Sequence, residues 1–227
     1  PDIDYKDTFK TTYQLLKVMK EFKVKRFHFA SSSAVYGDLG DTILHEEIGP
    51  LLPISNYGAM KLASEAQASA ARECFLDQVN IFRFPNVVGV PATHGVILDF
   101  VKKLSKNKDY LGVLGNGTQQ KSYLHVSDLI EAMFVVINQS KQYGLELVNI
   151  GPIDTGASVK WIAEKVVDKT GLDAKIIYGK GNQGWVGDVP KFNYSIDKIK
   201  SFGWLPKLNS EQAIEKAIDE IILQENI

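Results

Sequence analysis

Apolar and polar positions alternate along the chain in helical and extended patterns. Phe9, Tyr13, Leu16 and Met19 recur at helical spacing, which predicts a helix with one apolar face. A strand is expected directly after it, at residues 26–30. The same patterns continue, with helices expected at 56–75, 95–106, 128–139, 159–169 and 210–222, and strands at 79–84, 121–126, 145–150 and 174–178. Strands that alternate with helices predict an α/β fold with a largely parallel sheet.

Residues with known capping preferences stand at several of the expected helix ends. Ser127 is placed to cap the helix over 128–139. Gly171 follows the helix over 159–169 and is expected to stop it. Asn209 and Gln212 are spaced as a capping box for the last helix.

Composition narrows the class of protein. The chain has 227 residues, 44% of them apolar, and a formal net charge of −1. The near-zero charge argues against a nucleic-acid binder or a polybasic membrane-surface protein, and no apolar run reaches the ~20 residues that a membrane span needs. The single cysteine, Cys74, excludes an internal disulfide and a thiolate zinc site. We therefore expect a cytoplasmic protein, and no metal site, because the four histidines show no ligand spacing.

One glycine motif resembles a dinucleotide loop but lacks its context. Residues 179–184 read Gly-Lys-Gly-Asn-Gln-Gly and follow an expected strand. A dinucleotide site needs a helix to open directly after the glycines. Residues 185–190, Trp-Val-Gly-Asp-Val-Pro, cannot open a useful helix. We interpret this motif as a loop.

Tyr57 and Lys61 are the first candidates for chemistry. They are four residues apart in an expected helix, so both side chains lie on one face. A free phenol, with a pKa near 10, is a poor base at neutral pH, and a neighbouring ammonium lowers that pKa. A tyrosine tuned in this way can exchange a proton with a substrate hydroxyl. The same spacing also occurs on solvent-exposed helices, so the pair alone does not identify a catalytic site.

Polar residues at two strand ends strengthen this hypothesis. Ser32 follows the strand over 26–30, and Asn86 follows the strand over 79–84. Open α/β sheets place their sites at the carboxyl ends of strands. Ser32 is expected to hydrogen-bond the hydroxyl that Tyr57 deprotonates.

The ordered set of motifs resembles the NAD-dependent epimerase/dehydratase family, the extended short-chain dehydrogenases/reductases, and within it the nucleotide-sugar 4-epimerases. The motifs are Ser-Ser-x-x-Val-Tyr-Gly, Tyr-x-x-x-Lys, Arg-x-x-Asn-x-x-Gly, residues 115–119 and 123–128, Gly-Asp at 187–188, and Gly-Trp-Leu-Pro at 203–206. The resemblance implies a Rossmann-like doubly wound parallel sheet with a smaller α/β substrate-binding lobe. It also implies an incomplete NAD-binding portion over 1–152 with interleaved lobe segments, a lobe mainly over 153–190, and a C-terminal helical segment over 191–227.

The resemblance also assigns roles to residues. Ser32, Tyr57 and Lys61 are implied to be catalytic. The implied NAD contacts are Ala30, Ser31, Tyr57, Lys61, Phe84 and Pro85. The implied nucleotide-sugar contacts are Ser32, Ser33, Asn86, Val96, Gly112, Leu114, Lys121 and Asp188. Lys121 stands where the family usually has an arginine. A homodimer is implied through the helices at 8–21 and 58–74.

Two departures from the family pattern shape the expected function. The glycine-rich segment that binds the adenosine diphosphate half of NAD is absent, so we expect an incomplete chain that is inactive alone and does not itself distinguish NAD from NADP. Dehydratases of this family carry an Asp-Glu pair where Ser33 and Ala34 stand here, so epimerisation is favoured over dehydration. The resemblance implies that the epimerisation takes place at C4 of a UDP-hexose. A nucleotide-sugar reductase or dehydrogenase, or a non-catalytic Rossmann-derived binding protein, remains an alternative. Neither the sugar nor the base is specified by the sequence.

Overall fold

The structure is a computed structural model that describes residues 1–181 and 193–227. These residues form two compact units. Unit 1 comprises 1–85, 131–150 and 193–205, and unit 2 comprises 86–130, 151–192 and 206–227 as far as they are described. The domain boundaries expected near residues 152 and 190 stay a prediction.

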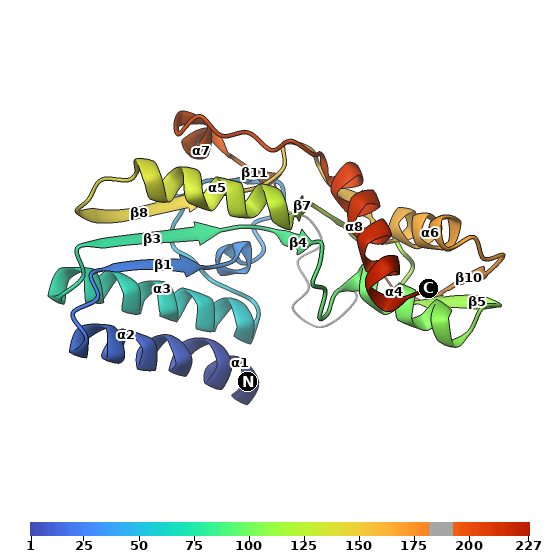
Figure 1. Cartoon of the computed structure of the whole chain (residues 1–227), viewed down its shortest axis with the longest axis horizontal. Coiled ribbons are helices and arrows are strands. Elements are labelled where there is room, and N and C mark those ends of the chain that lie inside the picture. Colours follow the sequence, from blue (N-terminus) through green and yellow to red (C-terminus); the bar gives the residue numbers. More distant parts are fainter. Residues whose placement is uncertain (182–192) are drawn as a thin grey trace. The chain divides into compact units, whose positions relative to one another are not determined.

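Unit 1 is built on a parallel sheet of three strands in the order β1-β3-β8. In Figure 1 these strands lie side by side. Their bounds are β1 Arg26–Ala30, β3 Gln78–Arg83 and β8 Gly144–Asn149. The remaining elements of unit 1 are α1 (Asp2–Asp4), the π-helical η1 (Tyr5–Lys10), α2 (Thr11–Glu21), the 3-10 turn η2 (Ser33–Tyr36), β2 (Ile43–Leu44), α3 (Asn56–Cys74), β11 (Asn193–Tyr194) and α7 (Asp197–Ser201). The parallel sheet that we expected to start at residues 26–30 is confirmed.

Helices α2 and α3 cover one face of this sheet (Figure 1). The cluster between them consists of Leu16, Met19, Phe27, Phe29, Ala68, Ala71, Leu76, Val79 and Ile81. All six residues of β3 are buried, including Asn80 and Phe82, which point to the opposite face. A parallel strand covered on both faces is typical of an α/β fold.

Unit 2 contains the rest of the described elements. They are β4 (Asn86–Val88), α4 (Val96–Lys106), β5 (Tyr110–Val113), β6 (Gln120–Lys121), β7 (Tyr123–His125), β9 (Ala157–Ser158), α6 (Val159–Thr170), β10 (Lys175–Tyr178) and α8 (Ser210–Glu225). The strands pair as β4 with β7 and β5 with β10, both parallel, and β6 with β9, antiparallel. Helices α4, α6 and α8 share one core with β5, β7 and β9. The remaining helix, α5 (Val126–Gln139), begins in unit 2 and ends in unit 1.

The helix ends confirm two of the three expected caps. Gly171 is left-handed, with φ 66°, and ends α6. Asn209 and Gln212 form the expected capping box of α8. The prediction that Ser127 caps the helix over 128–139 is wrong, because that helix, α5, already begins at Val126 and Ser127 lies inside it. The sequence pattern also assigns Tyr13 to the apolar, buried face of the first helix, which is wrong because its side chain is 58% exposed.

Two kinds of feature are absent from the described residues, a membrane-spanning helix and a cluster of metal ligands. In 1–181 and 193–227, none of the helices combines the length and the apolar character needed to cross a membrane. In the same ranges, no three His, Cys, Asp or Glu side chains are grouped to hold a metal ion. Cys74 is a free, exposed thiol.

Candidate active site

Ser32, Tyr57 and Lys61 all belong to unit 1 and come from two neighbouring segments. Ser32 lies between β1 and η2, and its hydroxyl accepts a hydrogen bond from the Ala34 amide at 3.2 Å, which caps η2. Tyr57 and Lys61 lie on the first turns of α3, which the Ser55 hydroxyl caps by accepting from the Gly58 amide. Gly58 allows α3 to approach η2, because a Cβ there would lie 2.4 Å from the Ala34 carbonyl oxygen.

Lys61 is held beside the tyrosine ring. Its Nζ donates to the Ala30 carbonyl oxygen at 2.8 Å, and it lies 5.1 Å from the centroid of Phe29 and 5.6 Å from that of Tyr57. Burial lowers the pKa of the Lys61 ammonium, and the carboxylate of Glu65 acts in the opposite direction. The predicted pairing of Tyr57 and Lys61 on one helix face is therefore present.

The electrostatic tuning expected of Tyr57 is not present in this structure. Partial burial raises the pKa of the Tyr57 phenol, while a hydrogen bond with Ser32 lowers it and Asp4 raises it. Burial dominates because it disfavours the charged phenolate. At 42% exposure Tyr57 remains open to solvent and to a ligand. Ser32 thus lies within hydrogen-bonding reach of Tyr57, but the lowered pKa that we expected for Tyr57 is not present.

The other unit 1 candidates differ in how free their polar groups are. Ser31 is 1% exposed; its hydroxyl donates to Glu65 at 2.5 Å and its amide to the Phe82 carbonyl at 2.8 Å. Ser33 is also buried, and its amide and hydroxyl both donate to the Phe84 carbonyl at 3.1 Å. Both hydroxyls are therefore used by the fold. Ala30 is exposed, and Phe84 and Pro85 are half-buried.

The expected substrate contacts, except those of Ser32 and Ser33, belong to unit 2 where they are described. Asn86 is exposed at the start of β4, and Val96 opens α4 half-buried. Gly112 lies in β5, and its carbonyl accepts from Lys103 at 3.2 Å. Leu114 is 70% exposed, and Lys121 is half-buried in β6. Asp188 lies outside the described residues, as do Trp185 and the second half of the glycine motif.

The first half of that glycine motif behaves as a loop. The Gly179 amide donates to the Val113 carbonyl at 3.0 Å, and the Gly181 carbonyl accepts from the Asn116 amide at 2.7 Å. The Gly179 amide is therefore not available to a phosphate.

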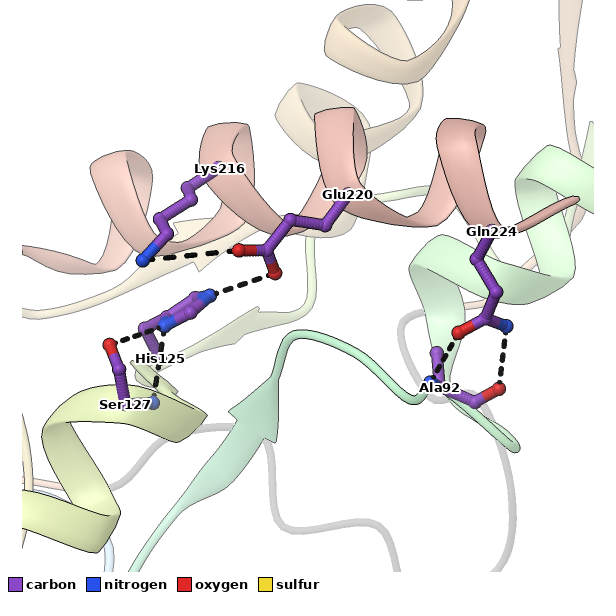
Figure 2. A network of polar contacts seen from close by, with 6 residues as sticks. All are labelled: Ala92, His125, Ser127, Lys216, Glu220 and Gln224. Carbon is purple, nitrogen blue, oxygen red and sulfur yellow. Dashed lines mark hydrogen bonds and ion pairs between the residues drawn. The ribbon is translucent and has the colours of Figure 1, made fainter. Parts of the chain in front are cut away.

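His125 has two side-chain hydrogen-bond partners in the structure, Ser127 and Glu220 (Figure 2). The Ser127 amide donates to its Nδ1 at 3.2 Å, so Nδ1 is an acceptor and the Ser127 hydroxyl, at 2.7 Å, donates to it as well. Nε2 then carries the proton and donates to Glu220 at 3.1 Å. Because Glu220 lies 95 residues away in the sequence, nothing in the local pattern could have revealed this contact.

Helix α8 makes a second contact of this kind one turn further on. Figure 2 shows the Gln224 amide facing the backbone of Ala92, whose N–H donates to it at 2.8 Å and whose carbonyl accepts from it at 2.9 Å. A shallow groove lies here, and its lining does not include the predicted unit 2 residues that the structure describes; it is lined by Val90, Pro91, Glu220, Leu223 and Gln224. These contacts hold the segment between Asn86 and Val96.

A buried ion pair next to the candidate residues was not predicted from the sequence. Glu65 of α3 and Arg83 of β3 form two hydrogen bonds, from Nε to Oε1 at 2.9 Å and from Nη2 to Oε2 at 2.6 Å. Their side chains are 7% and 4% exposed. The spacing of Glu65, four residues after Lys61, was the available signal.

Comparisons of the sequence and of the structure with known proteins point to the same family. Residues 1–151 match the model of the NAD dependent epimerase/dehydratase family. A putative UDP-glucose 4-epimerase of Methanocaldococcus jannaschii is 28% identical over 215 residues, which cover 92% of this chain and 67% of that protein. A crystal structure of UDP-galactose 4-epimerase is 32% identical, with a TM-score of 0.87, and covers 99% of this chain and 72% of its own. The complex of MoeE5 with UDP-glucuronic acid and NAD is 25% identical, with a TM-score of 0.81, over 97% and 72% of the two chains. The family match covers more than half of the sequence, and the chain therefore belongs to the NAD dependent epimerase/dehydratase family.

Proposed function

We propose that this chain carries the acid–base residues of an NAD-dependent nucleotide-sugar epimerase that acts at C4 of a UDP-hexose. The chain spans about two thirds of the length of the curated relatives that it matches, so the activity is proposed for the protein that carries it. The observation that carries the proposal is the set of Ser32, Tyr57 and Lys61 in one unit, with Lys61 over the Tyr57 ring.

The side chains around Tyr57 suit a nicotinamide cofactor. Lys61 uses one hydrogen bond on Ala30, which leaves donors for the hydroxyls of a ribose. Phe84 and Pro85 offer an apolar surface at the end of β3, where a nicotinamide ring would pack. NAD, when bound, supplies the hydride acceptor and donor that the reaction needs.

The protein residues would move the proton. Tyr57 would take the proton of the sugar 4-hydroxyl while the Ser32 hydroxyl holds the same oxygen by a hydrogen bond. Lys61, whose Nζ lies 5.6 Å from the centroid of the Tyr57 ring, would hold the ribose of the cofactor beside this oxygen. After the 4-keto sugar has rotated in the site and presents its opposite face, Tyr57 would return the proton to the oxygen on C4, whose configuration is then inverted.

Epimerisation is favoured over dehydration by the residues that follow Ser32. Dehydration needs an acid to expel water and a base at the neighbouring carbon. The Ser33 hydroxyl is buried and donates to the Phe84 carbonyl, and Ala34 has no ionisable group. Neither residue meets that need.

An outer face of unit 1 supports the proposed homodimer. Leu15 and Val18 share one face of α2 and are 47% and 49% exposed. Phe22, directly after the helix, is 71% exposed. Ala66 and Ala70 of α3 are exposed as well. A Val18→Glu variant should shift a dimer to monomer in light scattering, whereas Lys17→Glu on the same helix should not.

The function is tested by product analysis of the whole protein that carries this chain, with UDP-glucose and NAD. An epimerase yields UDP-galactose with no net change in NADH. Tyr57→Phe should abolish this conversion, whereas Tyr13→Phe, which changes an exposed tyrosine of the same unit, should not. Net accumulation of NADH with an oxidised sugar would instead establish the dehydrogenase alternative.

A further inference from the structure

The Glu65–Arg83 ion pair lies at the junction of the segments that carry the candidate catalytic residues. Glu65 follows Tyr57 by eight residues and Lys61 by four, so the three share one face of α3. Arg83 ends β3, directly before Phe84. The pair therefore connects the helix of the proposed base to the strand end beside it.

The same pair reaches the loop that carries Ser32. Glu65 Oε1 accepts from the Ser31 hydroxyl as well as from Arg83 Nε. On the other side of Ser32, the amide and hydroxyl of Ser33 donate to the carbonyl of Phe84, the residue after Arg83. Ser32 is thus held through both of its neighbours, and both connections lead back to the ion pair.

Arg83 extends this network to the segment after Ser33. Its guanidinium lies 4.8 Å from the centre of the Tyr36 ring. The Tyr36 hydroxyl donates to Asn149 Oδ1 at 2.8 Å, and Asn149 Nδ2 donates to the Leu44 carbonyl at 3.1 Å. Both ends of η2 are therefore fixed from the same buried centre.

We propose that Glu65 and Arg83 are a positioning pair, which sets the place of Ser32 relative to the Tyr57–Lys61 face of α3. The inference rests on the acid–base roles proposed above for these three residues. A stabilising role alone does not account for the pair, since replacing a buried ion pair by apolar side chains of similar volume is often neutral or stabilising. What such a replacement would remove is the directed link from Glu65 to Ser31.

The test separates positioning from stability with the double variant Glu65→Leu/Arg83→Met. This variant removes both charges together, so no buried charge is left unpaired, and we expect it to remain folded. Glu146→Leu/Lys198→Met is the matched control, because it removes another ion pair of unit 1, with an N–O distance of 2.6 Å. Ser31→Ala is a second variant, which leaves the ion pair in place and removes only its link to the loop.

The first measurement needs neither cofactor nor substrate. The phenol of Tyr57 is titrated by ultraviolet absorbance, with Tyr57→Phe subtracted. Its pKa should rise in the double variant and in Ser31→Ala, because Ser32 no longer lowers it, and should stay unchanged in the control. An unchanged pKa in both test variants would overturn the proposal.

The second measurement is the rate of the proposed reaction. A displacement near 1 Å costs about 10²-fold in rate, so kcat should fall by that factor in the double variant while KM stays near its normal value. A kcat that follows only the melting temperature across all variants would show a structural role and refute positioning. If the pKa responds as expected but the unaltered protein epimerises no sugar, the positioning pair stands and the proposed function fails.

Discussion

Gly156 offers a stability prediction that can be worked out from distances. It has φ +88°, and a Cβ built on it would lie 2.0 Å from the Lys121 carbonyl oxygen, 2.3 Å from its carbon and 2.6 Å from the Ser122 nitrogen. Real Cβ atoms essentially never come closer than 3.0 Å, so Gly156→Ala must open this contact by about 1 Å. The neighbouring residues pair β6 with β9, with Lys121 opposite Ala157.

Two costs add in this variant. A left-handed conformation costs an alanine about 1–2 kcal/mol, and forcing a methyl group into a packed backbone costs about 1–3 kcal/mol. The expected loss is about 2–5 kcal/mol, or a melting temperature lower by roughly 4–20 °C at about 2–4 °C per kcal/mol. Because β6 must move, Lys121 moves with it.

Gly171→Ala is the matched control. Gly171 has φ +66°, lies in the same unit, and has no atom within 4 Å of a built Cβ. It therefore carries the conformational cost of about 1–2 kcal/mol without the steric one. Both changes are glycine to alanine, so their effect on the unfolded chain cancels in the difference.

Urea unfolding followed by circular dichroism gives the two free energies. Hydrogen exchange of the amides at 119–123 shows whether the extra loss is local to β6. Gly156→Ala should lose more stability than Gly171→Ala by about 1–3 kcal/mol and should speed exchange there. Equal losses in the two variants would refute the steric argument.

Three further outcomes are expected. Tyr57→Phe should lower kcat by about 10²–10⁴-fold and leave the melting temperature unchanged, and a near-normal kcat would remove Tyr57 as the base. Arg83→Met should cost about 3–5 kcal/mol because it leaves a buried carboxylate unpaired, whereas Arg72→Met, which breaks an exposed pair, should cost about 0–1 kcal/mol. Burial raises the pKa of Tyr36, so the folded state keeps the phenol proton at a pH at which the unfolded state has lost it. The free energy of unfolding should therefore fall as the pH rises above about 10. Urea midpoints measured at two pH values should show a weaker pH dependence in Tyr36→Phe.

The part of the fold set by local periodicity could be predicted from the sequence. Long helices repeat their apolar face several times, and the capping box of α8 lies within four residues. Strands of two or three residues, such as β4, β6 and β9, have no room for a period, and long-range backbone pairing defines them. Serine is a common cap, so the sequence predicts a helix that begins at residue 128, whereas α5 begins at Val126 and the Ser127 amide donates to Nδ1 of His125.

The candidate site divides in the same way. Tyr57 and Lys61 could be recognised because one helical turn joins them, and Ser32 because it follows a strand. Glu65 and Arg83 could not be paired, because their contact depends on α3 packing against β3. The direction of the Tyr57 pKa was also beyond the sequence, since it depends on how much solvent α3 and its surroundings exclude.

The division of the candidate residues between the two units has a kinetic consequence. In the part of the chain that the structure describes, Ser32, Tyr57 and Lys61 lie in unit 1, whereas Asn86, Lys121 and the other expected substrate contacts beyond the serine loop lie in unit 2. Groups that exchange protons act in the transition state, and their loss lowers kcat. Groups that hold a diphosphate or a base act equally in the ground state, and their loss raises KM. Gln224 holds the backbone of Ala92, which lies between Asn86 and Val96 of the second set, so Gln224→Ala should raise KM and leave kcat unchanged. A fall in kcat for Gln224→Ala at unchanged KM would show that α8 also serves the chemical step, and would contradict this separation.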